Sequence, residues 1–296
     1  MIEWKGTFPA ITTPFTEHGA VDHEFLAEHS RWLVAAGCAG VIPLGSLGEG
    51  ATLTTAEKRA VVETIVTAVD APVIAGIAAL STGDAVELAR AAHAAGSRGL
   101  MVLPPYVYST DEREMHAHVS AVIDATPLPC MLYNNPPAYR TDFTPPQIVR
   151  LAERHANLVA VKESSGDVRR ITALRALAGD RLAIAIGVDD LVVEAVAAGA
   201  VAWVAGLVNA FPRESVALFD HARRGEHDRA AALYRWFLPL LRMDTVPKFV
   251  QLIKLAQAHV RMGSARVRAP RLELDGAELA EAEATLRAAL AHREAP

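Results

Sequence analysis

Short apolar runs recur along the chain, and each is followed by a longer stretch in which apolar residues have helical spacing. Eight such runs cover residues 8–12, 40–44, 72–77, 99–104, 129–134, 158–163, 182–187 and 200–206. Their apolar residues are continuous rather than alternating with polar ones, which is typical of strands buried on both faces of a parallel sheet. The pattern therefore predicts an α/β protein with eight parallel strands.

The stretches between the runs include amphipathic helices, which we expect at residues 22–36, 54–69, 82–95 and 144–155. Thr54 stands three residues before Glu57, as in a capping box at a helix N-terminus. Gly37, Gly96 and Gly199 each follow an alanine where a left-handed turn would end a helix. Strand–helix units in strict alternation favour a (β/α)8 TIM barrel over a doubly wound sheet.

No low-complexity linker or shift in composition divides the chain, so we expect one catalytic barrel over residues 1–225. Three further helical stretches follow at 227–242, 247–262 and 275–292. A minimal barrel does not need them. We expect residues 226–296 to form a C-terminal helical extension that packs against the barrel or against another subunit.

Composition narrows the class of protein. Of the 296 residues, 51% are apolar and 21% are charged, which excludes a disordered chain. The formal net charge of −5 gives no basic footprint for nucleic acid. Cys38 and Cys130 form no disulfide framework, and the sequence has neither a signal peptide nor an apolar stretch long enough to cross a membrane. We expect a cytoplasmic globular protein with no nucleic-acid or membrane partner.

In such barrels the working residues come from the C-terminal ends of the strands and from the loops that follow them. Lys162 is the one lysine of five that ends an apolar run, whereas the other four lie near the N-terminus or on predicted helices. Apolar surroundings favour the free amine over the ammonium, and a free amine attacks a carbonyl to form a Schiff base. The alternative is a structural lysine that pairs with Glu163.

The stretch Gly45-Ser46-Leu47-Gly48-Glu49 follows the second run. Its hydroxyl and backbone N–H groups suit a small carboxylate, which needs several converging donors. The stretch is not a phosphate-binding P-loop, because it has neither the spacing nor the lysine of that motif. We predict substrate contacts from Gly45, Ser46 and Leu47, and the alternative is a purely conformational role for the glycines.

Candidate residues also stand at the ends of other strands. Tyr133, near the end of the fifth run, is a candidate proton shuttle at an imine, with Tyr106 or Tyr108 as a relay. For each tyrosine the alternative is a packed ring with a satisfied hydroxyl. Asn134 and Gly187, at the ends of the fifth and seventh runs, complete the predicted substrate-binding set.

Other polar clusters do not predict chemistry. His116 and His118 diverge on a predicted helix and cannot chelate a metal ion together, and the sequence has no HExxH motif. Asp189 and Asp190 follow the seventh run, where we expect them to cap the next helix rather than to bind a metal. We therefore expect no metal site.

The motifs at strand ends resemble those of a known family. They are residues 45–49, 132–134 and 161–163. Together they resemble the dihydrodipicolinate synthase / N-acetylneuraminate lyase family of class I aldolases, over nearly the whole chain. The resemblance implies that Lys162 forms the Schiff base, that Tyr133 shuttles protons, and that Ser46 holds the substrate carboxylate or relays protons. It also implies a small 2-oxo-acid or cyclic imino-acid substrate, no cofactor, and a homotetramer built from pairs of dimers.

Two positions depart from the synthase pattern. Leu47 stands where the synthases carry a second threonine. Ala138 stands where they carry an arginine that holds a second carboxylate, and Arg140 would replace that arginine only if the loop shifted. Both departures count against a dihydrodipicolinate synthase.

The resemblance is greater to one branch of the family, the 1-pyrroline-4-hydroxy-2-carboxylate deaminases of hydroxyproline degradation. It covers residues 133–137, 162–167, 209–214 and 234–241. This branch implies conversion of the hydroxypyrroline to 2,5-dioxopentanoate and ammonia. Two alternatives stay open. One is 4-hydroxy-tetrahydrodipicolinate synthase, or another pyruvate or 2-keto-3-deoxy-acid aldolase or dehydratase of the family. The other is a non-catalytic sensor of 2-oxo acids, although such a sensor would have lost the lysine or the tyrosine.

Overall fold

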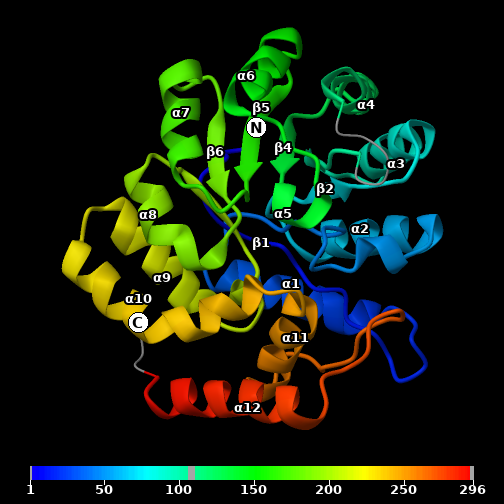
Figure 1. The fold of residues 1–296 in the computed structure, drawn as a ribbon. Helices are drawn as coiled ribbons and strands as arrows, with labels where there is room; N and C mark the ends of the chain where they lie inside the picture. Colours follow the sequence, from blue (N-terminus) through cyan, green and yellow to red (C-terminus); the bar gives the residue numbers. More distant parts are fainter. Residues whose placement is uncertain (1, 106–110, 294–296) are drawn as a thin grey trace.

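The parallel sheet curls into a barrel (Figure 1). The computed structural model describes residues 2–105 and 111–293. Within them, seven strands pair in the order β1-β7-β6-β5-β4-β3-β2. Their bounds are β1 Gly6–Pro9, β2 Ile74–Ile77, β3 Gly99–Val102, β4 Cys130–Asn134, β5 Leu158–Glu163, β6 Ala183–Ile186 and β7 Ala202–Ala205.

The remaining predicted run, residues 40–44, closes the barrel between β1 and β2. Ile42 forms a parallel bridge to Ala10 next to β1, and Val41 forms one to Val73 next to β2. The run is not a regular strand, because Pro43 has no N–H for the ladder and the next residue has a left-handed φ of 67°. The predicted (β/α)8 barrel is thus confirmed, with one strand reduced to isolated bridges.

Helices surround the barrel. Their bounds are α1 His23–Ala35, α2 Thr55–Ala68, α3 Thr82–Ala94, α4 Glu112–Asp124, α5 Pro136–Tyr139, α6 Pro145–Arg154, α7 Arg169–Ala178, α8 Val192–Ala197, α9 Pro212–Arg223, α10 His227–Leu241, α11 Phe249–His259 and α12 Gly276–Ala291. The capping box before α2 is confirmed, since Glu57 N donates to Thr54 Oγ1 over 3.2 Å and Thr54 N donates to Glu57 Oε2 over 2.9 Å. No helix among residues 2–105 and 111–293 is long and apolar enough to cross a membrane.

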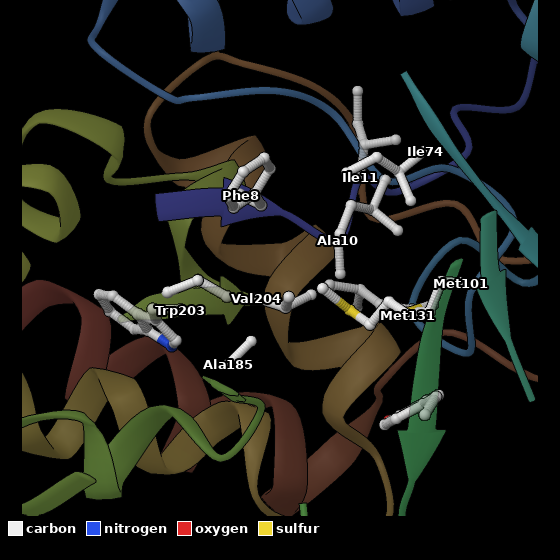
Figure 2. Packing of buried hydrophobic residues seen from close by; sticks show 14 of the residues in the cluster. Phe8, Ala10, Ile11, Ile74, Met101, Met131, Ala185, Trp203 and Val204 are labelled. Atoms are coloured by element: carbon white, nitrogen blue, oxygen red, sulfur yellow. The ribbon is translucent and has the colours of Figure 1, made fainter. Parts of the chain in front are cut away.

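Buried side chains from several strands fill the barrel (Figure 2). Ala10, Met131 and Val204 lie close together at its centre, with Met101 beside them. Each of these four residues is at most 7% exposed. Ala10, Met101 and Val204 also line a cavity at the C-terminal ends of the strands. The core residues nearest the C-terminal ends of the strands therefore form the floor of this cavity.

The C-terminal helices α10 to α12 gather on one side of the barrel, where Figure 1 shows them in yellow to red. Trp236 on α10 donates through Nε1 to the carbonyl of Ala289 on α12 over 3.0 Å. On α11, Lys254 Nζ donates to Glu49 Oε1 over 2.5 Å, and both side chains are buried. The extension therefore contacts the barrel within the same chain, at the loop that follows residues 40–44.

Candidate active site

A cavity of about 620 Å³ opens at the C-terminal ends of the strands, and a volume of this size suits a small organic substrate. Six of the predicted residues line it: Gly45, Ser46, Leu47, Tyr133, Lys162 and Gly187. The C-terminal extension completes the wall with residues 244–247, Phe249 and Arg271. None of the residues that the extension supplies was among the residues predicted from the sequence.

Lys162 extends from β5 into this cavity and is only 5% exposed. It is in register with Tyr133 on β4, and its Nζ lies 4.1 Å from the centre of the Tyr133 ring. Glu163 has other partners, because its Oε1 accepts from Ser165 N over 2.7 Å and its Oε2 accepts from Asn134 Nδ2 over 3.2 Å. In the described part of the chain no ion pair joins Lys162 to Glu163. The arrangement suits an amine that reacts with a bound carbonyl.

Gly187, just after β6, gives the lysine side chain its space. A Cβ at this position would overlap both Lys162 Cε and Ser164 Oγ. Ser164 also lines the cavity, and its hydroxyl has no hydrogen-bond partner among residues 2–105 and 111–293. Glycine is therefore required for the lysine to lie across the end of β6, and a hydroxyl that the sequence did not single out lies beside it.

The side chains of Ser46, Tyr133 and Tyr139 line the same cavity as the lysine and contact one another. Asn135 Nδ2 donates to Tyr133 OH over 2.9 Å, which fixes the position of that hydroxyl. Tyr139 makes a hydrogen bond with Ser46, and its ring meets the Tyr133 ring edge-on at 5.8 Å between centroids. The structure thus brings Ser46 and Tyr133 together through Tyr139.

Tyr139 was not among the predicted residues, although the sequence holds a signal for its position. Asn135 is followed by two prolines, and the first of them begins the one-turn helix α5 that carries Tyr139 back to the cavity wall. The predicted relay residues Tyr106 and Tyr108 lie outside the described residues.

Two residues discussed from sequence lie away from the cavity wall. Asn134 is fully buried, where its Oδ1 accepts from Phe143 N over 2.9 Å. Its Nδ2 donates to Glu163, so it supports the wall instead of lining it. Arg140 is exposed at the end of α5, while Ala138 lines the cavity. The loop has therefore not shifted to bring Arg140 to the position of the synthase arginine.

Residues of the C-terminal extension bind the loop 45–49 through the side chain of Glu49. Glu49 has a left-handed φ of 51° and is 1% exposed. Its carboxylate accepts from Lys254 Nζ, and also from the backbone N–H of Arg268 over 3.0 Å. Thr13 Oγ1 donates to Gly48 O over 2.6 Å from the barrel side. These bonds fix the backbone on which Ser46 and Leu47 stand.

Asp189 does not cap the following helix, so that expectation was wrong. It is fully buried, and it accepts from Trp203 Nε1 over 2.9 Å and from Leu207 N over 2.8 Å. A third N–H, from the backbone of Gly206, donates to it over 3.1 Å. A buried carboxylate needs several donors, and the free N–H groups after β7 supply them. Burial raises the pKa of Asp189 to about 6. These hydrogen bonds and the charge of Lys162 lower the pKa, but their effect is smaller than that of burial.

Asp244, in the 3-10 turn η4 (Arg242–Asp244), was not singled out from sequence. It lines the cavity and packs against Gly206, where a Cβ would overlap its carboxyl group. Arg271 also lines the cavity, with its Nη1 4.0 Å from Glu49 Oε2. Both come from the extension, so only tertiary packing brings them to the barrel.

Comparisons with known proteins show the family of the chain. The model of the dihydrodipicolinate synthetase family matches residues 3–289. The 4-hydroxy-tetrahydrodipicolinate synthase of Agrobacterium fabrum is 34% identical over 292 residues, which cover 98% of this chain and 98% of that relative. The structure of the synthase from Methylacidiphilum fumariolicum has a TM-score of 0.93 at 28% identity and covers 98% of both chains. YagE, an E. coli prophage protein solved in complex with pyruvate, has a TM-score of 0.91 at 27% identity and covers 97% of this chain and 99% of its own. The chain therefore belongs to the dihydrodipicolinate synthetase family, whose members are Schiff-base enzymes of the class I aldolase type.

Proposed function

We propose that this protein deaminates 1-pyrroline-4-hydroxy-2-carboxylate to 2,5-dioxopentanoate and ammonia, with Lys162 as the Schiff-base residue. The observation that carries the proposal is the cavity wall at Ala138, where the synthase pattern has an arginine for a second carboxylate. Arg140 is exposed and does not replace it. The hydroxypyrroline has one carboxylate, which the loop 45–49 and Ser164 are suited to hold with their hydroxyl and N–H groups.

The reaction begins at the ring imine of the substrate. The Lys162 amine attacks C2, and the ring opens by transimination, which leaves a primary amine on C5. The imine nitrogen then serves as an electron sink, so that a proton can leave C3 and an enamine forms. Tyr133 is the candidate for moving this proton, with the hydrogen-bonded pair Ser46 and Tyr139 beside it.

The enamine expels the hydroxyl group from C4, and the resulting conjugated iminium isomerises to an imine at C5. Water hydrolyses that imine and releases ammonia. A second water hydrolyses the bond to Lys162 and frees 2,5-dioxopentanoate. The elimination releases one water and the two hydrolyses consume two, so the net reaction adds one water to the substrate.

A second candidate is 4-hydroxy-tetrahydrodipicolinate synthesis from pyruvate and aspartate semialdehyde. The name of the Agrobacterium relative and the pyruvate bound to YagE favour it. So does Arg271, which lines the cavity and carries a positive charge. That charge lies 4.0 Å from the buried Glu49 carboxylate, which reduces its availability for a second substrate carboxylate.

A substrate comparison tests the proposal. We expect the hydroxypyrroline to yield ammonia and 2,5-dioxopentanoate with kcat/KM above roughly 10³ M⁻¹s⁻¹. Pyruvate with aspartate semialdehyde should give at least ~100-fold less, the cost of about two missing charge-assisted hydrogen bonds. Product identification by mass spectrometry and an ammonia assay measure both. If condensation of pyruvate with aspartate semialdehyde were faster than deamination, and Arg271→Met abolished it, the protein would instead be a synthase. Arg271 would then be the ligand of the second carboxylate.

We also propose that the protein is a homotetramer with closed symmetry. Leu80 is 67% exposed and Leu272 is 81% exposed, and burial of either side chain between subunits would remove apolar surface from water. Sedimentation at micromolar concentration should give a mass close to four chains of 31.6 kDa. A fully active monomer would contradict this expectation.

A further inference from the structure

The side chain of Asp244 brings a carboxyl group to the wall of the cavity. Its Oδ1 is covered from solvent and has no hydrogen-bond partner within residues 2–105 and 111–293. Buried polar atoms in proteins are nearly always paired, and exceptions often have a functional reason. The proposed mechanism so far uses no acid for the hydroxyl group that leaves the substrate.

Two glycines fix where this carboxyl group lies relative to Lys162. Asp244 packs on Gly206 after β7, in the same way that the lysine Cε packs on Gly187 after β6. The two strands are neighbours, and their register sets Gly206 two residues further toward the mouth than Gly187. Gly206 is therefore displaced from Gly187 by one strand spacing of ~4.8 Å to the side and by ~7 Å toward the mouth, and the Asp244 carboxyl group lies beside Gly206. A substrate bound through C2 to Lys162 extends into that space.

The charges around Asp244 favour its protonated form. Burial and the neighbouring Asp189 raise the pKa of Asp244 well above its usual range, and Lys162 opposes this effect. Asp190 adds a further negative charge nearby, but it has its own partner in Arg242 at 3.7 Å. A carboxylic acid kept neutral in this way can donate a proton.

We propose that Asp244 is a catalytic residue that protonates the C4 oxygen as it leaves the substrate bound to Lys162, an inference that rests on the proposed function. The nitrogen lone pair of the enamine re-forms the C2=N bond, and the C2=C3 electrons form a C3=C4 bond. The C4–O bond breaks, the oxygen takes the proton of Asp244, and water leaves. The resulting carboxylate faces the iminium cation on Lys162. The proton lost earlier from C3 returns to Asp244 through solvent.

The experiment compares elimination with a reaction that needs no leaving group. Pyruvate in D2O should exchange its methyl protons, because exchange requires only imine and enamine formation at Lys162. We expect Asp244→Asn to lower the ratio of hydroxypyrroline deamination to pyruvate exchange by at least ~100-fold, as for loss of a general acid. Asp244→Glu, which keeps an acid, should recover part of this ratio.

Asp228→Asn is the matched control, since it removes an exposed acid in the first turn of α10 that does not line the cavity, and its ratio should equal that of the wild type. A purely structural role of Asp244 would lower both reactions together, and an unchanged ratio would overturn the inference. If the wild-type protein exchanges pyruvate but releases no ammonia from the hydroxypyrroline, the proposed function fails and the role of Asp244 fails with it. Deamination at the wild-type ratio by Asp244→Asn overturns the role of Asp244 alone.

Discussion

Lys162→Ala is expected to lower turnover by at least ~10³-fold, because the missing nucleophile has no replacement within reach. The other buried lysine of the described chain, Lys254, is held by Glu49 on the far side of the loop 45–49. Reduction by borohydride in the presence of pyruvate should add the mass of the reduced adduct to the peptide that contains Lys162. Peptide mass spectrometry after digestion locates the adduct.

Two controls make this result specific. Lys5→Ala removes an exposed lysine and should leave both turnover and trapping intact. Lys162→Arg places a guanidinium group beside the Tyr133 ring but cannot form an imine, so it should be as inactive as the alanine variant. An adduct on another lysine, or no adduct at all, would refute the Schiff-base assignment.

Tyr133→Phe is expected to lower kcat by ~10²–10³-fold, the range of a lost general acid–base group. The ring keeps its contacts with the Lys162 amine and the Tyr139 ring, so the loss reports the hydroxyl group alone. The variant should still form the borohydride adduct, more slowly than the wild type. Steady-state kinetics and the rate of trapping measure the two effects separately.

Tyr234→Phe is the matched control, because the Tyr234 hydroxyl also makes a hydrogen bond but binds the carbonyl of Asp190 outside the cavity. It should retain wild-type kcat. If Tyr133→Phe were as active as this control, the proton would have to pass through Ser46 and Tyr139 instead.

Local patterns were enough to predict much of the fold. The capping box at Thr54 and Glu57 involves neighbours in sequence, and its bonds form as expected. The left-handed φ of Gly37, Gly96 and Gly199 follows from the same local logic. The apolar pattern of residues 40–44 predicts a full strand, because that pattern takes no account of the missing N–H of a proline.

Site residues were predictable from the sequence where they lie at the C-terminal end of a strand. Lys162 and Tyr133 stand on neighbouring strands of a parallel sheet, so topology alone brings them together. The prediction for Asp189 was wrong because its partners lie on β7 and directly after it, and not on the helix that follows Asp189. Asp244 and Arg271 reach the cavity through the packing of the C-terminal helices, which no pattern within the barrel specifies.

The buried pair of Glu49 and Lys254 joins two segments that are 205 residues apart. Removing one partner of such a pair leaves an uncompensated interior charge and costs about 3–5 kcal/mol. Consider a chimera of two family members whose crossover falls between these two positions. Its loop 45–49 would come from one parent, and the helix α11 that carries Lys254 would come from the other. A transfer of substrate specificity between family members should therefore move the loop 45–49 and α11 together.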